Sequence, residues 1–131
     1  MGGAIEFGAH LPLMDFGGHP YTLAHLTAYT RTAAQLGFDT LAVNDHLVFS
    51  VPWLDGPVAL AAVMEHSERM MLATTVALAV VRGPVPVAKT LGAIDRLSGG
   101  RLFDHYMASF ERVWELARPL AEARAELSAR A

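Results

Sequence analysis

The adjacent residues Asp45 and His46 are of the types that proton transfer requires. An imidazole titrates near neutrality, and a neighbouring carboxylate can fix its tautomer, so such a pair can act as an acid and a base. Both residues follow a run of strand-forming residues at 38–44, and His10 lies near the end of an earlier run at 5–12. The pair therefore predicts a proton-handling site at the ends of strands. The alternative is that His46 only hydrogen-bonds a loop carbonyl.

Strand and helix signals alternate along the chain, which is typical of βα units joined into a parallel sheet. We expect strands at 5–12, 38–44 and 70–79, and helices at 20–36, 58–67 and 85–98. Asp55 is expected to cap the second helix, and Gly99-Gly100 to end the third. From Asp104 the composition favours a helix to the C-terminus, and a short fourth strand at 101–103 is an open alternative. The prediction is one α/β domain over residues 1–131.

Length and composition exclude several classes of protein. The chain has 131 residues, whereas a complete eight-stranded α/β barrel typically needs about 250. Ten basic residues against 13 acidic ones, with no basic cluster, argue against nucleic acid as a partner. The absence of cysteine excludes disulfides and thiolate chemistry and agrees with a cytoplasmic location. The apolar run at 70–81 is too short to span a bilayer, so no membrane association is expected.

Several segments, in this order and spacing, closely resemble the bacterial luciferase-like family of oxidoreductases that use a flavin or the deazaflavin F420. The resemblance covers most of positions 4–102. The matching segments are Gly37-Phe38-Asp39-Thr40-Leu41, Asn44-Asp45-His46-Leu47, Leu72-Ala73-Thr74-Thr75-Val76, Arg82-Gly83-Pro84 and the helix that ends at Ser98-Gly99-Gly100-Arg101. The resemblance implies a partial, half TIM-type barrel, βαβαβα plus a C-terminal helix. The strand and glycine-rich loop that would follow Leu102 are missing, and the chain stops before the second half of the barrel.

The resemblance also implies a set of site residues. Asp45 and His46 would be catalytic and lie close to the reactive ring of the cofactor. The cofactor-binding residues would be His10, Asn44, Thr74, Thr75 and Val76. The peptide bond between Thr75 and Val76 is the candidate for a non-proline cis bond, and an ordinary trans strand is the alternative. The cofactor would be F420 or FMN, with the form Asn44-Asp45-His46 favouring F420. No metal site is expected, because the histidines lack metal-ligand spacing on one helix face.

The implied function is hydride transfer or monooxygenation of a small organic substrate. Reduced or no activity is expected of the isolated chain, because the phosphate-binding loops of later strands are missing. Alternatives are a non-catalytic dimeric binding or structural protein, or a fragment. We expect a homodimer, because the hydrophobic run at 70–79 needs cover on both faces, although the C-terminal helix could fold back instead. Its apolar residues include Val113, Trp114, Leu116, Leu120 and Leu127. Arg82 is expected to be a solvated loop residue, and contact with a phosphate or an acidic substrate is the alternative.

Overall fold

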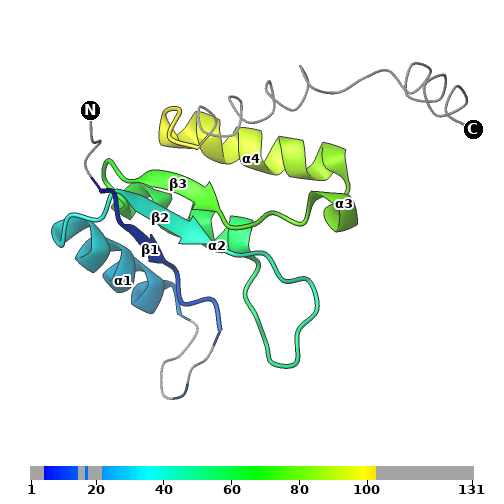
Figure 1. Cartoon of the computed structure of the whole chain (residues 1–131), viewed down its shortest axis with the longest axis horizontal. Helices are drawn as coiled ribbons and strands as arrows, with labels where there is room; N and C mark the ends of the chain where they lie inside the picture. Colours follow the sequence, from blue (N-terminus) through cyan, green and yellow to red (C-terminus); the bar gives the residue numbers. More distant parts are fainter. Residues whose placement is uncertain (1–4, 15–16, 18–21, 103–131) are drawn as a thin grey trace, which may run out of the picture.

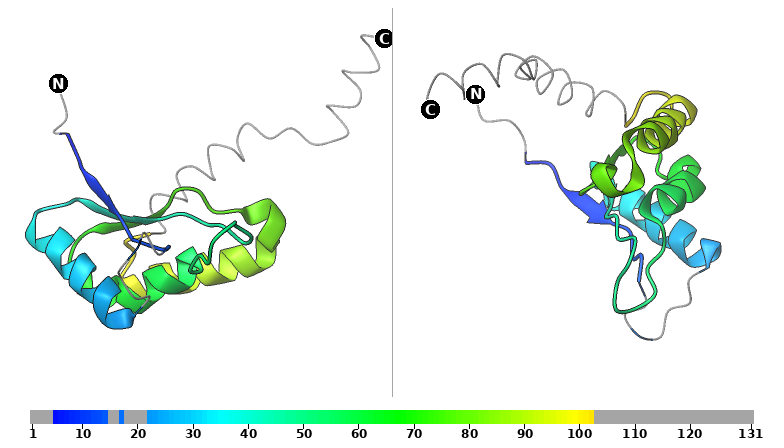
Figure 2. Two further views of the ribbon diagram at one scale, coloured as in Figure 1. Left: turned by 90° about the horizontal axis from the view of Figure 1, so that it is seen from below. Right: turned by 90° about the vertical axis from the view of Figure 1, so that its right-hand side faces the viewer.

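The chain forms an open, three-stranded parallel sheet with helices on one face (Figures 1 and 2). The computed structural model describes residues 5–14, 17 and 22–102. Its elements, in chain order, are β1 (Gly8–His10), α1 (Leu23–Gln35), β2 (Thr40–Val43), α2 (Gly56–Val63), the 3₁₀ turn η1 (Met64–His66), β3 (Met71–Thr74), α3 (Ala79–Arg82) and α4 (Pro84–Ser98). The strands lie in the order β1-β2-β3, so each crossover brings the chain to the next position in the sheet. The predicted α/β class is confirmed.

Local sequence signals set the ends of the helices. The Thr22 hydroxyl accepts the N–H of His25 at the start of α1, and the Asp55 carboxylate accepts the N–H of Val58 at the start of α2. Side-chain oxygens at these positions satisfy N–H groups that have no partner within the helix. Gly99 ends α4 in the left-handed conformation, with φ at 77°. The predicted Asp55 cap and the glycine end of α4 are both confirmed.

The third strand is shorter than the sequence predicts. β3 ends at Thr74, and the chain leaves the sheet after Thr75, so the predicted strand at 70–79 is wrong beyond that point. The chain bends because the N–H of Leu78 is donated to the Asp45 carboxylate, and the carbonyl of Leu78 then accepts the N–H groups of Val81 and Arg82 to start α3. An uninterrupted apolar run cannot distinguish a strand from a short helix.

After α4 the structure has a turn. The sequence had left a short fourth strand open as an alternative at this place. Arg101 and Leu102 lie in this turn. Phe103 and the C-terminal helix predicted from Asp104 lie outside the described residues, so that prediction is untested. None of the described helices is long and apolar enough to cross a membrane.

The core lies between the sheet and its helices. Leu41, Val43 and Leu72 point toward the helices and have no exposed surface. They pack in one cluster with helix residues that include Leu26, Leu60 and Ile94. Because side chains alternate along a strand, the other face of the sheet carries His10, Thr40, Ala42, Met71, Ala73 and Thr75. In Figure 2 none of the described helices covers that face. Apart from Met71, the side chains at these positions are small or polar.

Candidate functional site

The carboxyl ends of the three strands meet at one edge of the sheet, as parallel pairing requires. His10 ends β1, Asn44 follows β2 and Thr75 follows β3. In open and closed α/β folds this edge is where ligands usually bind. The polar residues predicted from the sequence therefore lie at the expected end of the sheet.

A contact between His10 and Thr75 crosses the middle strand. The Nε2 atom of His10 lies 3.3 Å from the Thr75 hydroxyl, and its Nδ1 atom lies 3.2 Å from the carbonyl oxygen of Leu11. Because β2 separates β1 from β3, the imidazole must pass over it. Ala42 is the residue of β2 that pairs with His10, and its methyl group leaves the necessary space. The two predicted cofactor-binding residues thus form one polar bridge on the uncovered face.

The three residues at the end of β3 do not share one environment. Thr74 is buried, whereas Thr75 and Val76 are exposed. The backbone N–H of Thr75 still bonds the carbonyl of Val43 at 2.6 Å, which keeps it in register with β2. The peptide bond between Thr75 and Val76 is cis, so this prediction is confirmed. Thr75 reaches the face on which His10 lies, and Thr74 points to the opposite one.

Asp45 is a fully buried ion-pair partner. Its Oδ2 atom accepts bonds from Nε of Arg82 at 2.7 Å and from the N–H of Leu78 at 3.0 Å, and its Oδ1 atom accepts Nη2 of Arg82 at 2.5 Å. The hydrogen bonds from Arg82 lower the pKa of the Asp45 carboxyl, and they outweigh burial, which acts to raise it. Asp45 is therefore held as a carboxylate with both oxygens engaged, a state suited to positioning its neighbours.

His46 belongs to an aromatic cluster that the sequence analysis did not single out. Its ring centre lies 4.5 Å from that of Trp53 and 5.0 Å from that of Phe49, and the rings of Phe49 and Trp53 are 4.9 Å apart. The indole N–H of Trp53 bonds the side-chain oxygen of Asn44 at 3.1 Å. Asn44 thus orients the tryptophan against which His46 packs. The available signal was two aromatic residues, three and seven positions after His46, in the connection between β2 and α2.

Arg82 is not the solvated loop residue that the sequence predicted. It is the last residue of α3, and only 20% of its side chain is exposed. Besides the bidentate pair with Asp45, its Nη2 atom donates to Oδ2 of Asp55 at 2.6 Å. These two carboxylates raise the pKa of the guanidinium, although burial opposes them. The sequence-based expectation failed because both partners lie far from Arg82 along the chain.

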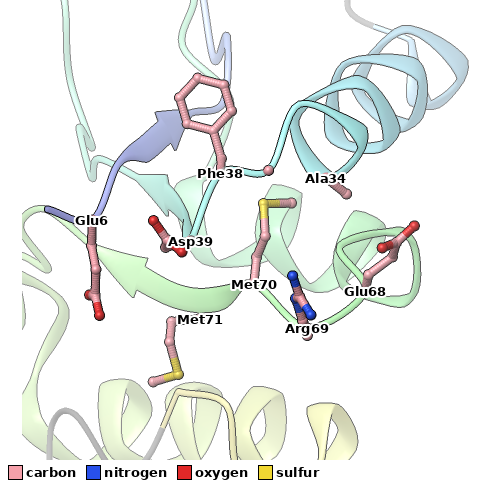
Figure 3. Close-up of a pocket in the computed structure, with 9 residues that line it drawn as sticks. Glu6, Ala34, Phe38, Asp39, Glu68, Arg69, Met70 and Met71 are labelled. Carbon is pink, nitrogen blue, oxygen red and sulfur yellow. The ribbon is translucent and has the colours of Figure 1, made fainter. Parts of the chain in front are cut away.

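A separate hollow of about 550 Å³ lies at the opposite end of the strands (Figure 3). Glu6, Asp39, Glu68 and Arg69 border it, with Met71 at its rim. These side chains are exposed, and Asp39 already accepts the backbone N–H of Phe7 at 2.9 Å. The hollow is thus remote from the residues that the sequence predicts to do chemistry. In the described part of the chain, no three acidic or histidine side chains are grouped so that they could hold a metal ion.

Comparisons with known proteins agree with this arrangement. A monooxygenase from Streptomyces bottropensis, RslO1, has a similar structure, with a TM-score of 0.60 and 24% sequence identity. The match covers 92% of this chain but 39% of that enzyme, and it supports the predicted partial TIM-type barrel. No protein of curated function matches the sequence significantly. The family model for luciferase-like monooxygenases matches residues 7–105, which is most of the chain. The chain therefore belongs to the luciferase-like monooxygenase family.

Proposed function

We propose that this chain forms the first part of a flavin or F420 site in an oxidoreductase that acts on a small organic substrate. The observation that carries the proposal is the 3.3 Å contact between His10 and Thr75, which joins the ends of β1 and β3 on the uncovered face of the sheet. When bound, the cofactor would supply hydride transfer or oxygen activation. The residues of this chain would bind its ring and handle protons.

The uncovered face suits a planar ring. Ala42 is buried and the His10 imidazole passes over it, so the His10 ring and the methyl group of Ala73 would form the surface for the cofactor ring beside Thr75. Asn44 and Val76 would border the ring at the ends of their strands. Thr74 would support Thr75 from the buried side. Arg82 is engaged by two carboxylates, so it does not supply a phosphate site. The geometry therefore favours ring recognition with weak overall affinity.

His46 is the better candidate for proton transfer. It is partly exposed at the strand ends, and an imidazole can both donate and accept a proton. Asp45, which the sequence also predicted to be catalytic, has both oxygens in use and a lowered pKa. We therefore propose that Asp45 positions its neighbours and that His46 transfers the proton. Asn44 would act indirectly, through Trp53.

The match to RslO1 covers 39% of that enzyme, so the residues of this chain correspond to only part of a barrel, and reduced or no activity is expected of this chain by itself. Pairing of two copies would cover the open sheet, which is the basis for proposing a homodimer. The alternative function is that of a non-catalytic binding protein or fragment derived from the family. Light scattering, combined with thermal melting at several protein concentrations, tests the dimer. A monomeric mass with concentration-independent melting would exclude it.

The cofactor proposal is tested by titrating ¹⁵N-labelled chain with FMN or F420 and following backbone amide shifts, which detects even millimolar binding. We expect saturable shifts at His10, Asn44, His46 and Thr75, and larger ones for F420 than for FMN. The Thr75→Val variant should show weaker shifts. The absence of saturable shifts with both cofactors, or shifts confined to the hollow near Glu68, would reject the proposed site and favour the non-catalytic alternative.

A further inference from the structure

Arg82 joins the two ends of the loop formed by residues 46–54, which carries His46, Phe49 and Trp53. Asp45 directly precedes this loop, and Asp55 directly follows it. Arg82 donates two hydrogen bonds to Asp45, at 2.7 Å and 2.5 Å, and one to Asp55, at 2.6 Å. A single guanidinium thus holds both ends of the loop. We call this three-residue arrangement the Arg82 clasp.

Each carboxylate of the clasp is also fixed to the backbone. Asp45 accepts the N–H of Leu78 at 3.0 Å, in the connection between β3 and α3. Asp55 uses its other oxygen to accept the N–H of Val58 at 3.1 Å, in the first turn of α2. Because the planar guanidinium presents its N–H groups in a rigid fork, it fixes the direction as well as the distance between the carboxylates. The base of the loop is therefore fixed to α2 and α3.

The remainder of the loop has little support of its own. Figure 1 shows it extending away from the sheet between β2 and α2. Val48 is 92% exposed and Phe49 is 49% exposed. Inside the loop, the indole N–H of Trp53 bonds Asn44, and the backbone N–H of Leu54 bonds the carbonyl of Leu13. Exposed segments with few buried contacts open at low cost in free energy, so the ends of this loop decide where its aromatic rings lie.

We propose that Arg82 is a positioning residue that keeps this loop closed at its base and thereby holds the His46 imidazole against the Trp53 indole. The role of His46 in proton transfer rests on the proposed function, but the closure does not. It is a property of the chain without a cofactor. Among the described residues, the titratable and charged groups at this end of the sheet, besides His46 itself, are Asp45 after β2, Asp55 before α2, Arg82 on α3 and His10 on β1.

Fluorescence of Trp53 reports on the proposed contact. A protonated imidazole in ring contact quenches indole emission more strongly than a neutral one. The Trp114→Phe background leaves Trp53 as the single tryptophan of the sequence. In this background we expect the emission to be lower in acidic buffer, where the imidazole is protonated, than in alkaline buffer. The His46→Phe variant should lose this dependence, which assigns the quenching to His46 and not to His10.

Removal of the clasp should separate the two rings. We expect Arg82→Met to lose most of the pH-dependent quenching, and Arg82→Lys to lose part of it, because an ammonium cannot replace the fork. Arg96→Met, at an exposed position on α4, is the matched control and should retain the full amplitude. Full quenching in Arg82→Met, with a native circular dichroism spectrum, would overturn the proposal.

The Asp55→Asn variant covers the case in which Arg82→Met fails to fold. Asparagine is as good a helix cap as aspartate, so α2 keeps its start while the contact with Arg82 loses its charge. We expect a partial loss of quenching in this variant, and unchanged quenching would overturn the proposal. None of these measurements requires a cofactor. If FMN and F420 fail to bind while the clasp variants lose quenching, the proposed function fails and the clasp stands.

Discussion

Leu72 donates its backbone N–H to the carbonyl oxygen of Arg101 at 3.2 Å, on the edge of β3 that faces away from β2. The neighbouring N–H groups of Met71 and Thr75 bond carbonyls on the β2 side, as strand alternation requires. Leu102, the next residue, is fully buried, and its N–H bonds Asp95 at 3.2 Å. The chain thus returns to the sheet after α4, and its own backbone meets the start of the β3 edge.

The Arg101 side chain should be a major source of stability at this return. Its guanidinium donates to the Ser67 hydroxyl at 2.6 Å and to the carbonyls of Met70, Met64 and Ser98 at 3.0, 2.8 and 3.0 Å. Burial lowers the pKa of this group. Replacement by methionine removes these four hydrogen bonds, so we expect the free energy of unfolding to fall by about 3 kcal/mol.

Urea denaturation measures the effect of Arg101→Met. The exposed Arg96 on α4 provides the control, since Arg96→Met should change the free energy of unfolding by no more than about 0.5 kcal/mol. Equal destabilisation by the two variants would show that the hydrogen bonds of Arg101 contribute nothing specific.

Gly56 should not tolerate a side chain. A Cβ atom at this position would overlap the backbone carbonyl oxygen of Asn44 and press on the side chain of Val43. Because the first turn of α2 packs directly beneath the end of β2, we expect Gly56→Ala to lower the free energy of unfolding by about 2 kcal/mol. Thermal and urea unfolding measure this change.

Gly92 gives a matched comparison within α4. A Cβ atom there meets nothing within 4 Å, so Gly92→Ala should raise the free energy of unfolding by about 0.5–1 kcal/mol through helix propensity. If Gly56→Ala also proved stabilising, the close approach of α2 to β2 would be wrong.

Asp45 should make the fold sensitive to acid. Its pKa is lowered in the folded chain from an ordinary value of 3.8, so its contribution is complete above that value and is lost as the pH falls through the folded pKa. Breaking a buried pair leaves its partner unmatched, so we expect Asp45→Asn to cost about 3 kcal/mol at neutral pH. As the pH falls below 3.8, the variant and the parent should approach each other in stability.

Denaturant titrations at a series of pH values provide the measurement. The exposed carboxylate Glu65 is the control, and Glu65→Gln should follow the pH dependence of the parent. A constant difference in stability between Asp45→Asn and the parent, from neutral pH to pH 2, would contradict a lowered pKa for Asp45.

Local patterns predicted the order of the elements well. The apolar periodicity of α4 and its glycine end can both be recognised within one short segment of the sequence. The Asp55 cap of α2 can likewise be recognised from its own neighbours in the sequence. The end of β3 could not be read in this way, because Leu78 leaves the sheet to bond a carboxylate 33 residues earlier. The hydrophobicity of the segment does not indicate that Leu78 bonds the Asp45 carboxylate.

For the candidate site, too, the positions of the residues could be predicted from local segments, but the contacts between them could not. The family pattern located His10, Asp45, His46 and Thr75 at the strand ends, because these residues sit inside recognisable segments. Their pairing was not predictable, since His10 meets Thr75 across 65 positions and Arg82 meets Asp45 across 37. Such contacts depend on the strand order and on the space that a small residue of β2 leaves. Two carboxylates that bracket a loop do not identify their cation.

The contact between His10 and Thr75 is the last test of the strand-end geometry. Thr75→Val keeps the shape of the side chain but removes the hydroxyl that lies 3.3 Å from Nε2 of His10. Because the bond is exposed, we expect the free energy of unfolding to fall by no more than about 1 kcal/mol. The imidazole resonances of His10 should nevertheless shift, since the hydroxyl helps to select the tautomer of the ring.

Thr32→Val is the control, because the exposed Thr32 hydroxyl bonds a carbonyl within α1, at Ala28. Nuclear magnetic resonance of the histidine side chains should show the His10 shift in Thr75→Val alone. Unchanged His10 resonances in that variant would mean that the ring does not cross β2 in solution.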